Sequence, residues 1–229
     1  MQKIILSIII PVLNEANNIE AVVDAIDLLD LNESNKQVII VDDGSTDGTI
    51  EKLKRMENSK SNYVIIYNDI NTGKGSAIYK GLQYVVGEYV AIIDADKEVD
   101  ISIIVEWMSL MRPGIDAIIG SREYQYIDNY LYYFGREVMT FVFKILFNSD
   151  VHDPLCGIKL LRREVIKSLV LLSHGFETDS EIMIRIIKGG YGYKCENVKY
   201  WPRKRINGKK IRPYHTIIIL AFWITEALK

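Results

Sequence analysis

The chain has 229 residues, of which 48% are hydrophobic and 25% are charged, and its formal net charge is −2. This length allows one large domain or two small ones, and the composition is ordinary for a globular core. The small net charge gives the molecule no strong attraction to polyanions, so we expect no nucleic-acid partner. Its two cysteines, Cys156 and Cys195, lie far apart without a CxxC spacing, which disfavours a thiolate zinc site.

The first 120 residues alternate short apolar runs rich in β-forming residues with helical stretches. The expected strands are residues 4–10, 37–41, 63–67, 89–93 and 117–119. The expected helices are residues 15–29, 46–57, 76–86 and 101–111. This alternation predicts an α/β fold with a mostly parallel central sheet flanked by helices. The strands are continuous apolar runs, as expected when both faces of a sheet are buried.

Polar clusters follow the first four of these strands. They are Asn14-Glu15, Asp42-Asp43, residues 68–75 and Asp94-Ala95-Asp96. In such sheets ligands bind beyond the carboxyl ends of the strands, so the clusters should meet at one edge. Asp94 and Asp96 are the most informative, because paired carboxylates offer the hard oxygen ligands that suit Mg²⁺ or Mn²⁺ holding a diphosphate. We therefore expect an enzyme that handles a nucleotide-diphosphate compound.

The second half of the chain is more aromatic. Residues 129–147 predict one or two helices joined near Gly135, which either pack on the sheet or form a platform that touches lipid. Residues 199–212 contain seven basic residues and no acid, which fits either a solvated loop or a site for phosphate or an anionic membrane. Thr178-Asp179-Ser180-Glu181 has the pattern of a capping box at a helix start.

The apolar run of residues 216–225 is too short to cross a bilayer as a helix, since about 20 residues are needed. It would lie in the membrane interface, pack on the domain, or begin a membrane segment that continues beyond this sequence. We expect no signal peptide, because the first apolar run contains Ser7 and Pro11 and lacks a cleavage-like pattern. The expected organisation is a catalytic domain over residues 1–212 and a C-terminal apolar helix over residues 213–229.

Several motifs occur in one particular succession. They are Pro11-Val12-Leu13-Asn14-Glu15, residues 41–49, Asn71-Thr72-Gly73-Lys74-Gly75 and Asp94-Ala95-Asp96. This succession resembles the family 2 inverting glycosyltransferases. Gly120-Ser121-Arg122, residues 153–159 and residues 175–179 narrow the resemblance to the polyprenol-phosphate (dolichol-phosphate) mannosyl- and glucosyltransferases. The resemblance covers about residues 4 to 212.

The resemblance implies a GT-A fold whose N-terminal half binds a nucleotide-sugar donor, either a UDP- or a GDP-hexose. Asp42 or Asp43 would meet the base and ribose, and Asp94 and Asp96 would bind Mg²⁺ or Mn²⁺. Glu98 stands where many relatives carry Gln, and it would add a third carboxylate to the metal. The implied donor-binding set is Pro11, Asn14, Glu15, Asp42, Asp43, Gly73, Lys74, Asp94, Ala95 and Asp96.

The acceptor decides whether the reaction needs a base. A phosphomonoester is largely deprotonated near neutral pH and needs cations to place it, whereas a sugar hydroxyl needs a general base. Arg122, Arg136 and Arg205 are the candidates for the acceptor phosphate, because a guanidinium matches phosphate bidentately. Arg136 also fits an ordinary surface charge on a helix. By resemblance Asp179 faces the reacting sugar, so with Asp94 and Asp96 it completes the expected catalytic set as a sugar contact or a base.

Three functions follow from these residues. The first is a hexosyltransferase that uses polyprenyl or dolichyl phosphate at the cytoplasmic face of a membrane, held peripherally or through its C-terminus. The second is a related glycosyltransferase with a hydroxyl acceptor on a saccharide or lipid-linked glycan. The third is a catalytically silent module that binds sugar nucleotides. The sequence leaves UDP-glucose, GDP-mannose and UDP-N-acetylglucosamine open as donors.

Overall fold

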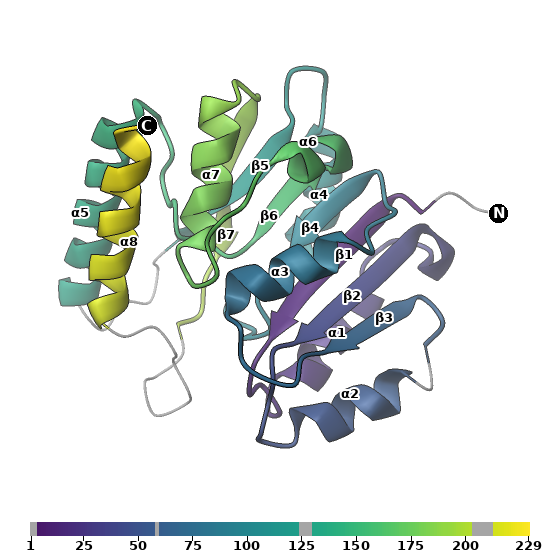
Figure 1. Cartoon of the computed structure of the whole chain (residues 1–229). Helices are drawn as coiled ribbons and strands as arrows, with labels where there is room; N and C mark the ends of the chain where they lie inside the picture. Colours follow the sequence, from purple (N-terminus) through teal and green to yellow (C-terminus); the bar gives the residue numbers. More distant parts are fainter. Residues whose placement is uncertain (1–3, 58–59, 124–129, 203–212) are drawn as a thin grey trace.

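The computed structural model describes residues 4–57, 60–123, 130–202 and 213–229. A seven-stranded sheet lies at its centre, in the order β3-β2-β1-β4-β6-β5-β7 (Figure 1). The strands are β1 Leu6–Val12, β2 Lys36–Asp42, β3 Tyr63–Tyr67, β4 Tyr89–Ile92, β5 Ala117–Glu123, β6 Lys159–Arg162 and β7 Tyr193–Lys199. Only β6 runs antiparallel to its neighbours β4 and β5 among these strands. The expected mostly parallel α/β architecture is therefore confirmed, and β6 and β7 are additions to the strands that the sequence predicted.

Helices cover both faces of this sheet (Figure 1). They are α1 Ile19–Asp27, α2 Thr49–Glu57, α3 Lys74–Leu82, α4 Ile103–Leu110, α5 Tyr130–Phe147, α6 Arg163–Ser168, α7 Thr178–Lys188 and α8 Pro213–Ala227, with a short 3-10 helix, η1, at Glu33–Asn35. The helix α5 continues through Gly135, so this aromatic stretch forms one helix.

Alternate residues of β1 face the two sides of the sheet, as the period of a strand requires. Ile8 and Ile10 belong to a core that includes Trp107 of α4, whereas Ile9 belongs to a second core that includes Phe143 of α5 and Trp223 of α8. The second core thus extends beyond the sheet and joins the C-terminal helix to the domain.

The helix α8 packs on the domain beside α5 and α7. Phe143 of α5 and Trp223 make an edge-to-face aromatic contact with ring centroids 4.9 Å apart. Trp223 Nε1 donates to Ser180 Oγ of α7 at 2.8 Å, and Arg185 Nη1 of α7 forms an ion pair of 2.7 Å with Glu226 Oε2. In the part of the chain that the structure describes, no helix has both the length and the apolar character to cross a membrane.

Candidate active site

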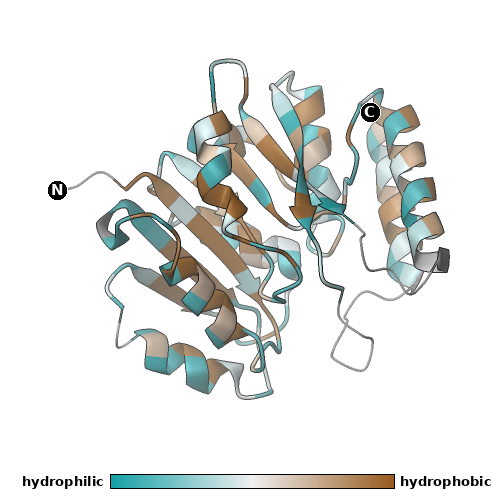
Figure 2. Ribbon diagram, turned by 180° about the vertical axis from the view of Figure 1, so that it is seen from behind, coloured by the Kyte–Doolittle hydropathy of each residue, from teal (hydrophilic) through white to brown (hydrophobic). Residues whose placement is uncertain are grey.

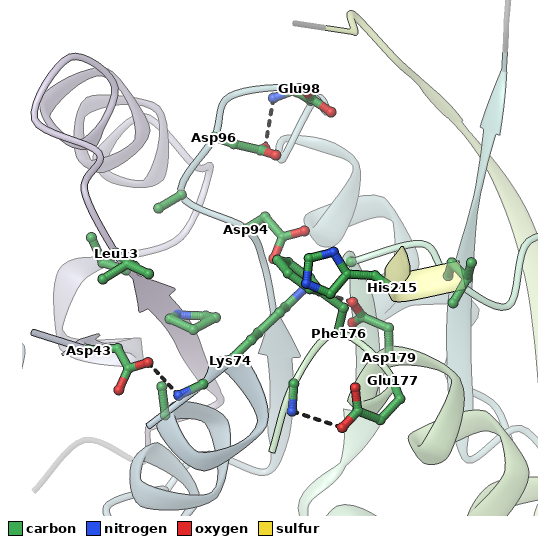
Figure 3. A pocket seen from close by; sticks show the side chains of 18 of the residues that line it. Leu13, Asp43, Lys74, Asp94, Asp96, Glu98, Phe176, Glu177, Asp179 and His215 are labelled. Carbon is green, nitrogen blue, oxygen red and sulfur yellow. Dashed lines mark hydrogen bonds and ion pairs between the residues drawn. The ribbon is translucent and has the colours of Figure 1, made fainter. Parts of the chain in front are cut away.

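A cavity of about 480 Å³ opens at the carboxyl ends of β1, β2 and β4, at the edge where the sequence predicted a ligand site (Figure 3). It brings together most of the predicted donor residues with residues expected to bind metal, acceptor or sugar. Those on its wall are Pro11, Glu15, Asp43, Gly73, Lys74, Asp94, Ala95, Asp96, Glu98, Arg122 and Asp179. Residues from motifs that are far apart in the sequence therefore line one cavity.

Asn14 and Asp42 are not among the residues that line this cavity. Asn14 has a left-handed backbone (φ 50°), and its side-chain oxygen accepts from Thr46 N at 2.7 Å. It thereby joins the loop after β1 to the turn after β2. Asp42 is fully buried, and its Oδ2 accepts from Ser45 N at 3.1 Å. Its Oδ1 has no hydrogen-bond partner among the described residues, which is a costly state for a buried acceptor.

Asp43 holds the loop that precedes α3. Its Oδ1 accepts from Thr72 N and Thr72 Oγ1 at 2.9 and 2.8 Å, and its Oδ2 accepts from Gly73 N at 2.7 Å. Gly73 has φ of 99°, a region that favours glycine because it has no Cβ. The Asp43 carboxylate thus fixes the turn from which Lys74 enters the cavity.

The acidic turn after β4 contains the expected metal ligands. The Asp94 side chain is 32% exposed and faces the cavity, as Figure 3 shows. Asp96 Oδ1 accepts from Glu98 N at 3.1 Å, and the intervening Lys97 has φ of 60°. Glu98 is buried, and its Oε2 accepts from Tyr200 OH at 2.7 Å. Glu98 therefore ties the turn to the segment after β7, and within the described residues no group of three potential ligands is assembled as a metal site.

Two lysines and two carboxylates alternate at the back of the cavity. Lys74 Nζ lies 2.6 Å from Asp94 Oδ1 and 2.7 Å from Asp179 Oδ2, and Lys159 Nζ lies 3.0 Å from Asp179 Oδ1. Burial alone would raise the pKa of Asp179, but the charges of Lys159 and Lys74 outweigh burial and lower that pKa. Burial would likewise lower the pKa of Lys74, but Asp179 and Asp94 raise it. The formal charges of the two lysines and the two carboxylates cancel.

Two of the three predicted acceptor arginines, Arg122 and Arg136, line a second cavity of about 430 Å³, beside α5. Arg122 Nε and Nη2 donate to the two carboxylate oxygens of buried Asp153 at 2.7 and 2.8 Å. Arg136 Nη1 donates to the Arg122 carbonyl oxygen at 3.2 Å, and Lys144 and His152 complete a basic wall. Arg122 also lines the first cavity, so it lies between the two cavities. The third candidate, Arg205, lies outside the described residues.

Sequence reasoning missed several residues of the site. Lys159 is buried in β6, and a lysine next to the apolar run 160–161 was the available signal. Phe176 and His215 line the cavity with ring centroids 4.9 Å apart. His215 belongs to α8, and nothing in its local sequence placed it at a site more than a hundred residues away from Asp94.

The expected capping box at the start of α7 is wrong. Thr178 is the first residue of the helix, and its hydroxyl donates to Gly175 O at 2.9 Å. Glu181 accepts from Leu172 N and Ser173 N at 2.9 and 2.8 Å. The carboxylate therefore fixes the preceding loop, which crosses close to α3.

Solved structures of known enzymes share this fold. Glucosyl-3-phosphoglycerate synthase from Mycobacterium tuberculosis, in complex with Mn²⁺, UDP and phosphoglyceric acid, aligns with a TM-score of 0.72 at 20% identity. The alignment covers 97% of this chain and 78% of that one. The likeness confirms the expected GT-A fold.

The family follows from sequence. Residues 7–170 match the family model described as Glycosyl transferase family 2, and the chain therefore belongs to that family of glycosyltransferases. A dolichol-phosphate mannosyltransferase of Pyrococcus furiosus is 29% identical over 91% of this chain and 61% of its own length. A dolichyl-phosphate beta-glucosyltransferase of Saccharomyces cerevisiae is 31% identical over 82% of this chain and 64% of its own length. The chain thus spans less than two thirds of either relative.

Proposed function

We propose that this protein transfers a hexose, with inversion, from a nucleotide-diphosphate sugar to a polyprenyl or dolichyl phosphate, and that it needs Mg²⁺ or Mn²⁺. Membership of family 2 supports the sugar transfer. The printed names of the two relatives support the polyprenyl phosphate, and the solved complexes with UDP and Mn²⁺ or Mg²⁺ support the donor and the metal.

The ion pairs and the lowered pKa of Asp179 are the observation that favours a phosphate acceptor over a hydroxyl acceptor. Both of its carboxylate oxygens are taken by lysines, and its lowered pKa makes it a weak proton acceptor. A general base works best with a pKa near the operating pH, so Asp179 would deprotonate a hydroxyl acceptor poorly. A phosphate acceptor needs no base. We therefore assign Asp179 to holding Lys74 and contacting the sugar.

The basic cavity supports a place for the acceptor phosphate. It brings Arg122, Arg136 and Lys144 to one wall, together with His152 and with Glu137, which pairs with Arg136, and the arginine and lysine cations would orient a phosphate. Because Arg122 lines both cavities, a phosphate held in the second would lie next to the donor in the first. Asp153 holds the guanidinium of Arg122 in a fixed direction through its two hydrogen bonds.

The donor residues fit a nucleotide diphosphate and a divalent ion. Asp43 lines the cavity, so of the two carboxylates it is the one proposed to meet the base and ribose, whereas Asp42 is fully buried outside the cavity lining. Asp94 and Asp96 offer hard oxygens next to the cavity, with Glu98 bracing their turn, so they are the proposed ligand pair. A bound metal ion would stabilise the negative charge that develops on the leaving diphosphate.

Two adjacent helices support a membrane surface as partner. Along α5 the side chains of Phe134, Val138, Phe141 and Ile145 are exposed, and along α8 those of Tyr214, Ile217, Ile218 and Ile224 are exposed. Figures 1 and 2 both place these helices side by side, and Figure 2 shows hydrophobic residues along each. Exposed apolar area of this kind marks a partner or lipid. We propose peripheral binding at the cytoplasmic face, with residues 1–212 as the catalytic domain and 213–229 contributing to attachment.

The test incubates the protein with Mn²⁺ and a panel of labelled UDP- and GDP-hexoses. Polyprenyl phosphate, free polyprenol and a soluble oligosaccharide are offered as separate acceptors. We expect label to enter the organic phase with polyprenyl phosphate alone. Transfer to polyprenol or to the oligosaccharide instead would select a hydroxyl acceptor. Nucleotide binding by calorimetry without transfer or hydrolysis would identify a silent binding module.

A further inference from the structure

The ammonium group of Lys74 bridges two carboxylates in the donor cavity, and its two partners are unequal. Asp179 is nearly enclosed, with 7% of its side chain exposed, whereas 32% of Asp94 is exposed to the cavity. Lys74 itself is 13% exposed. Figure 3 shows its side chain reaching between the two carboxylates. A ligand that enters the cavity can therefore reach the Asp94 end of this bridge more readily than the Asp179 end.

The backbone of Lys74 is fixed to the segment that leads into Asp179. Gly75 N donates to His174 O at 2.7 Å. A Cβ at Gly75 would overlap Thr178 Oγ1 and Ser173 O, so the start of α3 lies directly on the segment before α7. Lys74 and Asp179 are thus held together by neighbouring elements. Asp94 belongs to a different element, the turn after β4, and it is joined to this pair by the ammonium group.

The ammonium group of Lys74 contacts the same carboxylate that we propose as a metal ligand, that of Asp94. A cation 2.6 Å from Asp94 Oδ1 repels a second cation that approaches the same carboxylate, and the repulsion is strong at a partly buried site. Lys74, Lys159, Asp94 and Asp179 already cancel in formal charge, so these four groups offer a divalent ion no net negative charge, and Asp96, the second proposed ligand, supplies one. A diphosphate brings the negative charge that balances both cations.

We propose that Lys74 is a resident counter-cation: it pairs with Asp94, weakens metal binding there, and moves to the diphosphate when the donor binds. Asp179 keeps the ammonium group within reach during this exchange. The inference rests on the proposed function. It adds that the metal and the nucleotide bind cooperatively. Because linkage is reciprocal, the metal should strengthen nucleotide binding by the same factor as the nucleotide strengthens metal binding.

The test measures Mn²⁺ affinity by electron paramagnetic resonance, with and without UDP, on the full chain. Lys74→Met removes the ammonium group and keeps an unbranched side chain. Lys80→Met removes the same charge from the same helix, but Lys80 Nζ donates to Asn68 Oδ1 at 2.6 Å and does not touch Asp94. In Lys74→Met we expect UDP-free Mn²⁺ affinity to rise about tenfold or more, and the enhancement by UDP to shrink. In Lys80→Met the UDP-free affinity should stay within about twofold of the native value.

The outcomes separate this inference from the function on which it rests. If UDP promotes Mn²⁺ binding in the native protein but Lys74→Met leaves UDP-free affinity unchanged or weaker, Lys74 does not compete with the metal. An equal gain in Lys80→Met would point to net charge alone and would also overturn the inference. If the native protein binds no Mn²⁺ even with UDP, the proposed metal site itself is wrong.

Discussion

Gly157 lies against the carboxylate of Asp94 with no room for a side chain between them. A Cβ at position 157 would overlap Asp94 Oδ2. Gly157 follows buried Cys156 in the segment that leads into β6, so it is fixed from behind by the core. The direction of the proposed metal ligand is therefore set by a residue more than sixty positions away, in a part of the chain that contains none of the proposed metal ligands.

Gly157→Ala should displace the Asp94 carboxylate. A shift of about 1 Å in a positioned group can cost about 100-fold in rate, and we expect a loss of that order in sugar transfer. Mn²⁺ binding in the presence of UDP should weaken in parallel. Gly135→Ala is the matched control, because a Cβ there meets no atom within 4 Å. It should leave Mn²⁺–UDP binding unchanged and stabilise α5 by about 0.5–1 kcal/mol. Native turnover in Gly157→Ala would show that Asp94 is not held from this side.

Asp179→Asn tests whether this carboxylate is a base or a holder of lysines. The substitution leaves Lys159 buried without its counter-charge, so the free energy of unfolding should fall by about 3 kcal/mol. With polyprenyl phosphate as acceptor, transfer should fall by only about tenfold, and the shape of the pH–rate profile should not change. Glu177→Gln, on the same cavity wall, serves as the comparison. A loss of about 1,000-fold or more in a folded Asp179→Asn variant would identify Asp179 as the base.

The sequence was sufficient for the parts of the site that lie at the ends of predicted strands. Asp43, Lys74 and Asp94 each follow or precede an element whose periodicity is readable, and parallel strands bring their ends to one edge. Lys159 and His215 were not predictable in this way, because each comes from an element whose place beside the others is decided by tertiary packing. The antiparallel insertion of β6 between β4 and β5 has no local signal either.

For two further polar residues, the sequence did not predict the groups with which their side chains form hydrogen bonds. Asn14 was expected at the donor, yet it is an exposed residue that links two loops and does not line the cavity. Glu181 fits a capping pattern in sequence, but its carboxylate binds backbone N–H groups of the loop before α7. In both cases a polar side chain near a helix start satisfies backbone groups from another segment, which a local motif does not reveal.

The buried pair of Arg122 and Asp153 should make stability depend on acid pH. Burial alone would raise the pKa of Asp153, but the Arg122 guanidinium outweighs burial and lowers that pKa below its usual range. A carboxyl of this kind stabilises the fold above its unfolded pKa of about 4, and this contribution is lost as the pH falls through the lower folded value.

Asp153→Asn should therefore be less stable than the native protein by about 3 kcal/mol at neutral pH, since it leaves a partly buried guanidinium without its charge. The difference should shrink as the pH is lowered below about 4. Urea unfolding of both proteins between about pH 7 and pH 3 measures it. Asp30→Asn, at an exposed carboxylate, should show a much smaller difference. A constant gap across this range would show that ionisation of Asp153 contributes nothing to folding.

Lipid binding should depend on the apolar faces of both α5 and α8. Phe141 is 64% exposed on α5 and Ile217 is 69% exposed on α8, so charging either removes apolar area that would enter the interface. Phe141→Glu and Ile217→Glu should each weaken sedimentation with phosphatidylglycerol-containing vesicles by about tenfold, because burying such a side chain contributes about 1.5–3 kcal/mol. Leu28→Glu provides the control, since Leu28 is 85% exposed at the end of α1, outside these two faces. Thermal melting of each variant checks folding. If Leu28→Glu weakens binding as much as the other two, or if none does, the paired faces of α5 and α8 are not the lipid-binding surface.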